Sequence, residues 1–277
     1  MNQLKKSFIR PSITFLVAFL FSLPIFIIIV SAFKHSDEIR KHPASLPSHI
    51  TLENFSKVLI KNQSDLIPGL GRSLIITAIS ALVTCALSAQ LAYVLARSKN
   101  RKVKLFRGIL LAGFMVPGQV LLVPIVDVLR RVHLLGTLLG LVLANVGFFL
   151  PFGVFVFMRF IRGISTEIDE AAAIDGASRS RTFWVIIFPL LRPATASVLI
   201  FLTVWIWNDF LSPLIILGPL GGNTVITGLY YQVSSRQVSD YGSIFAYMLV
   251  ASAPILILFL FLQKQFISGL TAGATKG

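Results

Sequence analysis

Residues 137–160, TLLGLVLANVGFFLPFGVFVFMRF, form an apolar run in which Arg159 is the only charged side chain. A helix rises 1.5 Å per residue, so about 20 apolar residues cross the hydrocarbon core of a bilayer, which is about 30 Å thick. This run is long enough to span a membrane. An open strand could not, because every backbone N–H and C=O in lipid must be hydrogen-bonded within the structure.

The composition of the whole chain points the same way. Of its 277 residues, 55% are apolar and only 13% are charged, and the mean hydropathy is +0.83. In soluble domains about a quarter of the residues are charged. The 23 Phe residues can face acyl chains or fill gaps between helices with no polar atom to satisfy. The sequence therefore indicates an integral membrane protein.

The same length criterion finds six apolar windows along the chain. We predict an all-α polytopic membrane protein, a bundle of six transmembrane helices that forms a single domain over residues 1–277. The predicted spans are residues 12–33, 73–95, 106–128, 137–160, 194–217 and 242–262. A polar loop, residues 161–193, follows the fourth span.

The distribution of Lys and Arg predicts the orientation, because cytoplasmic loops carry an excess of both. The link after the second span has cations and no acid: Arg97, Lys99, Arg101, Lys102, Lys104 and Arg107. We expect this link, the 161–193 loop and both termini to be cytoplasmic, and residues 34–72 to lie outside. The net charge of +14 is then mainly a topological signal with some attraction to anionic lipid, and the scattered cations argue against nucleic-acid binding.

Two other interpretations of the N-terminal third are disfavoured. An apolar run after Lys6 that ends in Val30-Ser31-Ala32 resembles a signal peptide, but it is longer than the 7–15 residues of such a region, so we expect a retained helix. His35, His42 and His49 recur every seven residues, yet Pro and Ser surround them, so we predict no metal site.

Enzyme signatures are absent from the sequence. It contains no G-x-x-x-x-G-K-[ST], H-E-x-x-H or G-x-S-x-G motif, so we expect no ATPase site and no catalytic residue in this chain. Cys85 is the only cysteine and lies in the second predicted span, so disulfides cannot join the outer loops.

The 161–193 loop carries signals for two short helices. Thr166 and Asp169 have the spacing of a capping box, which predicts a helix through Ala173, and Gly176 can end it in a left-handed conformation. On that helix one face is defined by the spacing of Ile168, Ala171, Ala172 and Asp175.

A second helix is predicted to start at Ser178, which can cap it, and to run through Phe183 to Phe188. Pro189 is expected to end or kink it. The small residues on the face of the first helix would let another protein approach closely, although a solvated connector without a partner fits the same pattern.

These residues resemble a known family. Glu170-Ala171-Ala172, with Gly176 six positions after the glutamate and a hydrophobic stretch to Pro189, resembles the EAA loop of bacterial ABC importer permeases. The segment Trp207 to Leu211 and the C-terminal residues 265–277 are similar to carbohydrate permeases of the maltose-transporter type, in particular their smaller six-helix subunit.

The resemblance implies a division of labour among several proteins. Two permeases, which we expect to be a heterodimer, would form the path through the bacterial cytoplasmic membrane. Two ATPase subunits would bind ATP and Mg²⁺, so this chain needs no cofactor, and an extracytoplasmic binding protein would deliver the sugar, which we expect to be an oligosaccharide. The C-terminal tail, residues 269–277, would reach the ATPase. The residues expected to couple the permease to the ATPase are Glu170, Ala171, Ala172, Asp175, Gly176, Phe183 and Pro189.

Polar groups inside the fifth span are the candidates for the substrate path. Asn208 and Asp209 can exchange hydrogen bonds with hydroxyl groups, while Trp205 and Trp207 can cover the apolar face of a sugar ring. The same residues could instead fix this helix against a neighbour.

Three further polar residues have a structural interpretation. Asn145 and Gln90 fit interhelical hydrogen bonds, and Asp127 can pair with Arg130 or Arg131.

Other functions remain open at this point. An ion-coupled secondary carrier would place acids inside the membrane, where this sequence has few. A permease for a solute other than sugar, or a purely structural subunit, is also compatible with the apolar pattern.

Overall fold

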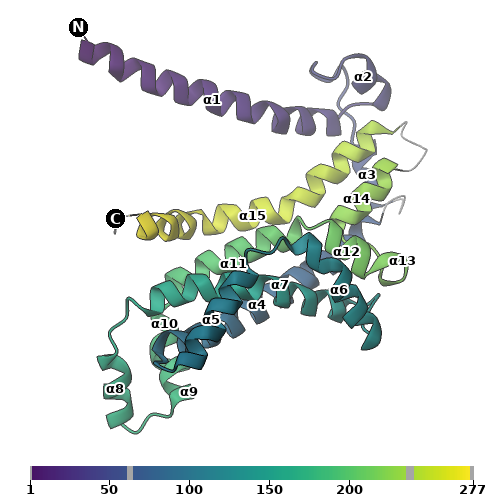
Figure 1. Cartoon of the computed structure of the whole chain (residues 1–277). Coiled ribbons are helices and arrows are strands. Elements are labelled where there is room, and N and C mark those ends of the chain that lie inside the picture. The colour runs from purple at the N-terminus through teal and green to yellow at the C-terminus, as the bar shows by residue number, and fades with distance from the viewer. Residues whose placement is uncertain (1, 61–64, 235–239, 275–277) are drawn as a thin grey trace. The chain divides into compact units, whose positions relative to one another are not determined.

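The computed structural model describes residues 2–60, 65–234 and 240–274, with side chains between residues 14 and 261 of those ranges. Every described element is helical, and these ranges contain no strand (Figure 1). The predicted all-α class is therefore confirmed. The side chains of residues 265–274, and all of residues 275–277, lie outside the described part, and with them the predicted contacts of the tail.

The chain divides into two compact units, each made of two stretches of sequence. One is Met1–Ile67 with Gly228–Pro254, and the other is Pro68–Thr227 with Ile255–Gly277. The single domain over residues 1–277 stays a prediction.

The first unit contains the helices α1 (Asn2–Ala32), α2 (Ser36–Lys41) and α3 (Glu53–Leu59), most of α14 (Val225–Ser234) and the first part of α15 (Tyr241–Ala274). Buried polar side chains join its short helices. Asn54 Nδ2 donates to the carbonyls of Ala32, at 2.9 Å, and Lys34, at 2.7 Å. The buried Lys34 ammonium donates to the His42 carbonyl and to Ser45 Oγ, so its charge is not left without hydrogen bonds.

The second unit contains most of the other helices. They are nearly all of α4 (Leu66–Arg97), then α5 (Arg101–Gly113), α6 (Gly118–Arg131), α7 (Leu138–Ile161), α11 (Arg192–Trp207), α12 (Leu211–Ile216) and α13 (Gly218–Gly221), with the short helices of the 161–193 loop.

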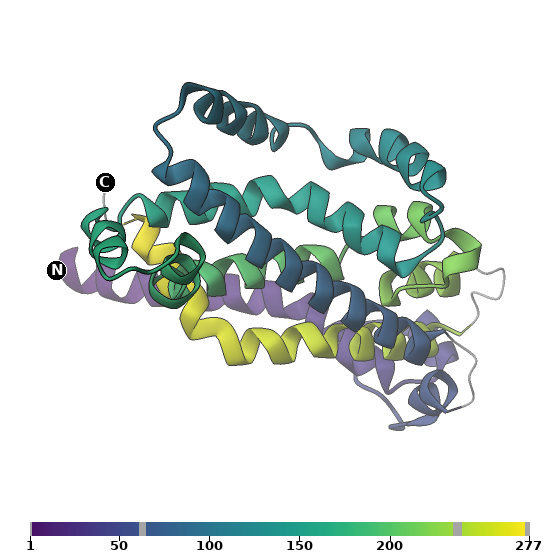
Figure 2. The same cartoon turned by 90° about the horizontal axis from the view of Figure 1, so that it is seen from below.

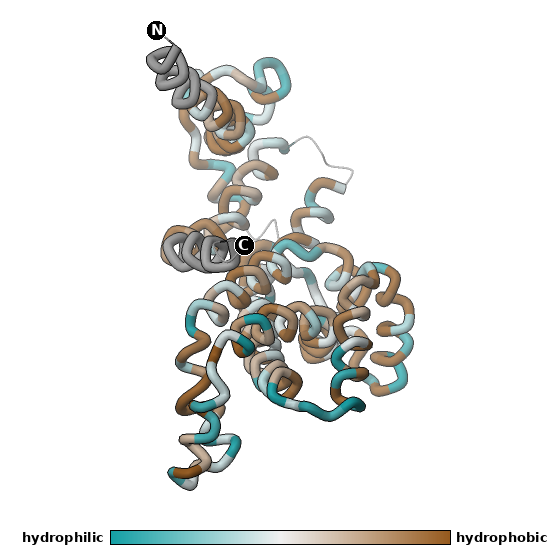
Figure 3. Tube along the Cα trace, turned by 60° about the vertical axis from the view of Figure 1, so that its left-hand side comes forward, coloured by the Kyte–Doolittle hydropathy of each residue, from teal (hydrophilic) through white to brown (hydrophobic). Residues whose placement is uncertain are grey.

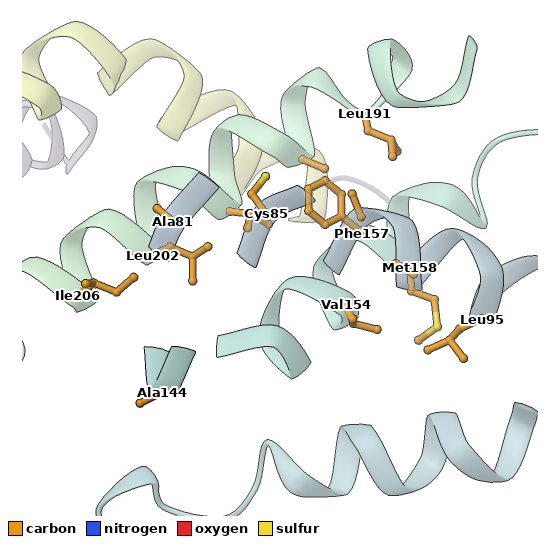
Figure 4. Packing of buried hydrophobic residues seen from close by; sticks show 14 of the residues in the cluster. Ala81, Cys85, Leu95, Ala144, Val154, Phe157, Met158, Leu191, Leu202 and Ile206 are labelled. Carbon is orange, nitrogen blue, oxygen red and sulfur yellow. The ribbon is translucent and has the colours of Figure 1, made fainter. Parts of the chain in front are cut away.

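Helices α4, α7 and α11 supply most of the core of this second unit. Cys85, Phe157 and Leu202 are among its buried residues, one from each helix (Figure 4). A Cβ atom on Gly153 of α7 would lie 2.3 Å from Ser88 Oγ of α4. Because no side chain fits there, glycine permits the close approach of these two helices, as small residues do at membrane helix interfaces.

Several helices are long and apolar enough to cross a membrane. Four do so as continuous segments: Thr14–Ala32, Leu66–Arg97, Leu138–Ile161 and Tyr241–Phe261. Two bent pairs, Arg101–Gly113 with Gly118–Arg131 and Arg179–Leu190 with Arg192–Trp207, bring the number to six if each pair counts as one span. Figure 3 shows apolar residues along the helices and polar ones in several connecting turns.

The third predicted span, residues 106–128, was expected to be continuous, and this is wrong. Helix α5 ends at Gly113 and α6 begins at Gly118, so a short link separates them (Figure 2). The two helices are bent by 107° relative to each other. Pro117 has no N–H to donate and disfavours helical backbone at Val116. Both helices contact α7.

The fifth predicted span, residues 194–217, is also interrupted. Helix α11 ends at Trp207, and α12 begins only at Leu211. Pro213 cannot donate to the carbonyl of Asp209, which prevents one regular helix through this segment. The Asn208-Asp209 pair therefore lies at a break between helices and not within one.

Candidate functional site

The first candidate site is α8 (Glu167–Ile174) in the 161–193 loop, which projects with α9 at one end of the second unit (Figure 1). Glu167, Asp169 and Glu170 lie in its first turn, where negative charge suits the helix dipole. The predicted capping box is wrong, because Thr166 makes no side-chain hydrogen bond to the helix. Asp169 instead turns toward α4.

The end of α8 agrees with the prediction. Gly176 has φ +75°, the left-handed region that the sequence predicted for it. The N–H of Ala177 donates to the Ala172 carbonyl at 2.9 Å, and the N–H of Gly176 to the Ala173 carbonyl at 3.1 Å. These two bonds form a Schellman motif, which fixes the direction in which the chain leaves the helix.

The predicted contact face of α8 is divided between the inside and the outside of the chain. Ala172 is 4% exposed, and Ile168 packs against the apolar core. Glu170, Ala171 and Ala173 are exposed. A partner that binds α8 would therefore meet the exposed side, while Ala172 acts through contacts within this chain.

The second helix of the loop begins as predicted but is not regular. Ser178 Oγ accepts a hydrogen bond from the N–H of Arg181 at 3.3 Å, which confirms the cap of α9 (Arg179–Arg181). A π-helix, η1 (Thr182–Ile187), follows, and then α10 (Phe188–Leu190). Pro189 lies inside α10 and the bend of 80° follows it at Leu191. Turns of π-helix occur often at functional sites.

Phe183 connects η1 to the rest of the loop. Its side chain is 3% exposed, and its ring lies 5.3 Å from that of Tyr93 on α4 and 4.9 Å from that of Trp184, between centroids. Phe183 is therefore an internal contact of the loop and not a surface for a partner. Pro189 and Asp175 are exposed.

Two residues of α4 hold this loop, and the sequence analysis missed both as site residues. The Tyr93 hydroxyl donates a hydrogen bond to the Asp169 carboxylate. Arg97 forms an ion pair with the same carboxylate, with 2.8 Å between Nη2 and Oδ2. Arg97 Nη1 also donates to the Ile164 carbonyl at 3.0 Å. The i, i+4 spacing of Tyr93 and Arg97 at a helix end was the available signal.

The second candidate site is a cavity of about 820 Å³ in the second unit, between α5, α6, α7 and the break after α11. Three of the four residues proposed from the sequence for a substrate path, Trp205, Asn208 and Asp209, line it, together with Gln119 and Phe149, which the sequence did not single out. Trp207 is 4% exposed and is not among the lining residues.

Aromatic rings form one part of the wall around this cavity. The ring of Trp205 is stacked on that of Phe149 at 5.7 Å and lies 4.9 Å from that of Phe152, between centroids. Asn208 Nδ2 donates to the Val204 carbonyl at 2.8 Å, and Asp209 Oδ1 accepts from the N–H of Ser212 at 3.3 Å. Both polar side chains thus form hydrogen bonds with nearby backbone where they line the cavity.

Two of the other three polar candidates have structural contacts. Asn145 Nδ2 donates to Ser80 Oγ at 3.4 Å, between α7 and α4, and Asp127 pairs with Arg131 at 2.8 Å, as predicted. Gln90 is exposed. Across the described ranges no three side chains of His, Cys, Asp or Glu gather as metal ligands would.

Comparison with known families gives a match over residues 88–271, which include α8, η1 and the cavity. The matching family is the binding-protein-dependent transport system inner membrane component. The chain belongs to this family. It is a multi-pass membrane permease, and the expected family resemblance is confirmed.

Individual relatives extend the likeness to nearly the whole permease. The multiple sugar-binding transport system permease protein MsmG of Streptococcus mutans is 33% identical over 258 residues, which are 92% of this chain and 91% of that protein. The diacetylchitobiose uptake system permease protein NgcG of Streptomyces coelicolor is 32% identical over 256 residues, 92% of this chain and 84% of that protein.

A solved structure supports the fold of the permease. A chain of a bacterial ABC transporter involved in the import of the acidic polysaccharide alginate matches with a TM-score of 0.83 and 17% identity, over 96% of this chain and 98% of that one. The all-α, polytopic fold of an ABC importer permease is thus confirmed.

Proposed function

We propose that this permease imports carbohydrate, with an oligosaccharide as its substrate, and forms half of the path through the membrane. The observation that carries the proposal is the likeness, over more than nine-tenths of the chain, to permeases named for multiple sugars and for diacetylchitobiose. The other half of the path would come from a second, different permease subunit.

The cavity fits such a path in size and chemistry. Its volume of about 820 Å³ lies within the range of about 300–1,000 Å³ for small-molecule sites. Trp205 and Phe149 offer aromatic faces for the C–H face of a sugar ring, while Asn208, Asp209 and Gln119 offer hydrogen-bonding groups for its hydroxyls.

The energy for transport would come from outside this chain. Two ATPase subunits would bind ATP and Mg²⁺, and this subunit would have no ATPase site. The coupling helix would be α8, which offers Glu170, Ala171 and Ala173 on its exposed side. Closure of the ATPase pair would then move the permease between two states as a rigid body. A sugar-binding protein outside the membrane would deliver the substrate.

We also propose the orientation that the cations indicate, with both termini, Lys102 and α8 in the cytoplasm of a bacterium and residues 34–72 outside. A cysteine placed at position 102 in a Cys85→Ser background tests it. An impermeant thiol reagent should label that residue only after the cells are opened. Labelling in intact cells would reverse the topology.

Uptake measurements test the proposed substrate. Cells that lack the permease should lose uptake of one oligosaccharide from a panel of mono- and oligosaccharides, and restoring the gene should restore it. An unchanged uptake of every sugar in the panel would contradict the carbohydrate assignment. Sugar uptake by the purified chain alone in liposomes, driven by an ion gradient, would support a secondary carrier instead.

A further inference from the structure

The inner side of α8 is attached to α4 by three side chains that we name the α4–α8 latch: Tyr93, Arg97 and Asp169. The Asp169 carboxylate accepts a hydrogen bond from the Tyr93 hydroxyl and pairs with Arg97 at 2.8 Å. The side chains of Arg97 and Asp169 are only 18% and 20% exposed, so solvent screens this pair less than it screens a surface ion pair.

Arg97 also holds the chain just before α8. Its Nη1 donates to the carbonyl of Ile164 at 3.0 Å, and its Nη2 to that of Ser165 at 3.4 Å. One guanidinium thus binds both the entry to α8 and a side chain within its first turn. The two contacts of Arg97, together with the hydrogen bond from the Tyr93 hydroxyl to Asp169, restrain the orientation of the helix as well as its position.

The remaining contacts on this side of α8 are small and apolar. Ala172 and Ile168 pack inward without directional bonds. Apolar contacts of this kind are non-directional, so they resist separation but oppose a rotation or a slide of the helix only weakly. The directional resistance in this contact comes from the latch.

The position of the latch on α4 gives it a mechanical role. Arg97 is the last residue of α4, a continuous helix long enough to cross the membrane, and α4 packs closely on α7 at Ser88 and Gly153. A movement of α8 that is passed to α4 therefore reaches the core of the second unit. If α8 moved without α4, only the 161–193 loop would change its conformation and the core would not move.

We propose that Tyr93 and Arg97 are positioning residues that make α8 and α4 move as one body, so that they set how much transport each ATP hydrolysed drives. This rests on the proposed function, in which α8 is the docking helix. The latch differs from the docking surface, because its three side chains face the inside of the chain while Glu170 and Ala171 face outward.

The test uses the complete complex of both permeases, the ATPase pair and the binding protein, reconstituted in liposomes. The variants are Arg97→Ala, Asp169→Ala and the double variant. Lys104→Ala and Asp37→Asn are the matched controls, since both residues are exposed and neither belongs to the latch or to α8. Three quantities are measured: ATPase retained on purification, ATP hydrolysis stimulated by the sugar-loaded binding protein, and sugar transported per ATP.

We expect both single variants to retain the ATPase while the sugar transported per ATP falls about fivefold or more, the low end of typical coupling between sites. The double variant should lose less than the two single losses combined, because both single variants remove the same ion pair. Arg97→Lys, which keeps the charge but not the planar fork, should recover part of the loss. The controls should match the original chain.

Several outcomes would overturn the latch. An unchanged amount of sugar per ATP in both single variants would do so, as would additive losses in the double variant. Loss of the ATPase from the Asp169→Ala complex would make the pair merely structural. If Ala171→Arg, on the exposed side, leaves ATPase retention and uptake unchanged, the docking role of α8 fails instead, so the two failures are distinguishable.

Discussion

The Lys57 ammonium lies 3.1 Å from Asp240 Oδ2 and joins α3 to the residue that precedes α15 in the first unit. Ser36 and Ser243 also donate to this carboxylate, each at 2.9 Å. Burial raises the pKa of Asp240, but the hydrogen bonds from Ser243, Ser36 and Lys57 outweigh it and hold the pKa below its ordinary value.

A group whose pKa is lowered by folding stabilises the folded state above its unfolded pKa, and this contribution disappears as the pH falls through the folded value. We therefore expect the purified chain to lose thermal stability as the pH falls below about 3.9, the ordinary value for Asp. Asp240→Asn should be less stable at pH 7 and should lose less on acidification. Unfolding curves in detergent between pH 3 and pH 7 measure this.

The control for Asp240 is Asp37→Asn, because the side chain of Asp37 is 80% exposed. This variant should keep the pH dependence of the original chain. If Asp240→Asn loses as much stability on acidification as the original chain, Asp240 is not the cause of the acid sensitivity.

Gly176→Val is expected to abolish sugar uptake and weaken ATPase retention. A residue with Cβ pays roughly 1 kcal/mol or more at φ +75°, so the turn after α8 would be set wrongly. Gly176→Asn is the matched control: Asn tolerates left-handed backbone, and a Cβ at this position meets nothing within 4 Å. Equal uptake by the Val and Asn variants would show that the left-handed turn does not matter.

Ala171→Arg and Ala172→Arg should both abolish uptake, but for different reasons. Ala171 is exposed, so Arg there should block the ATPase while the melting temperature of the permease stays unchanged. Ala172 is 4% exposed, so Arg there should also disturb packing within the chain and lower the melting temperature. Pull-down of the ATPase, together with melting curves, separates the two. Near-normal uptake by both variants would indicate a passive loop.

Asp209→Ala should reduce transport severalfold while the amount of assembled complex stays near normal. The residue lines the cavity, and its carboxylate accepts a hydrogen bond from the nearby N–H of Ser212, at 3.3 Å. Asp209→Asn keeps an oxygen that can accept this bond but removes the charge. A loss of transport in Asp209→Asn as large as that in Asp209→Ala would therefore be due to the lost charge. Loss of the assembled complex would instead mark Asp209 as structural.

The sequence by itself determined the features that depend on local chemistry or on length. Apolar runs predicted membrane helices, because a bilayer requires about 20 apolar residues whatever the neighbours are. Gly176 and Ser178 were predicted correctly because a left-handed turn and a side-chain cap each involve only residues a few positions away. The motif around Glu170 was sufficient to indicate the family, because it is read directly from the sequence.

Tertiary structure alone decided which way polar side chains turn and which prolines interrupt a long helix. Asp169 had the spacing of a local cap, but its carboxylate meets Tyr93 and Arg97, which are distant in sequence, and charged partners bind it more strongly than a backbone N–H. The spacing of Ala172 on α8 fitted a surface for a partner protein. Only the packing of α8 in the folded chain shows that this residue is buried.

Long helices break at Pro117 and after Trp207, near Pro213, whereas Pro124, Pro151 and Pro254 lie inside helices, so the structure was needed to show which prolines interrupt a span. Both segments are as apolar as a continuous span, and hydropathy does not record hydrogen bonds lost at a proline. Such a break is tolerated at membrane depth only where protein or a water-filled cavity receives the freed backbone groups. Here both breaks border the cavity that Asn208 and Asp209 line. No single stretch of sequence contains that arrangement, because five helices, α5, α6, α7, α11 and α12, contribute to its lining.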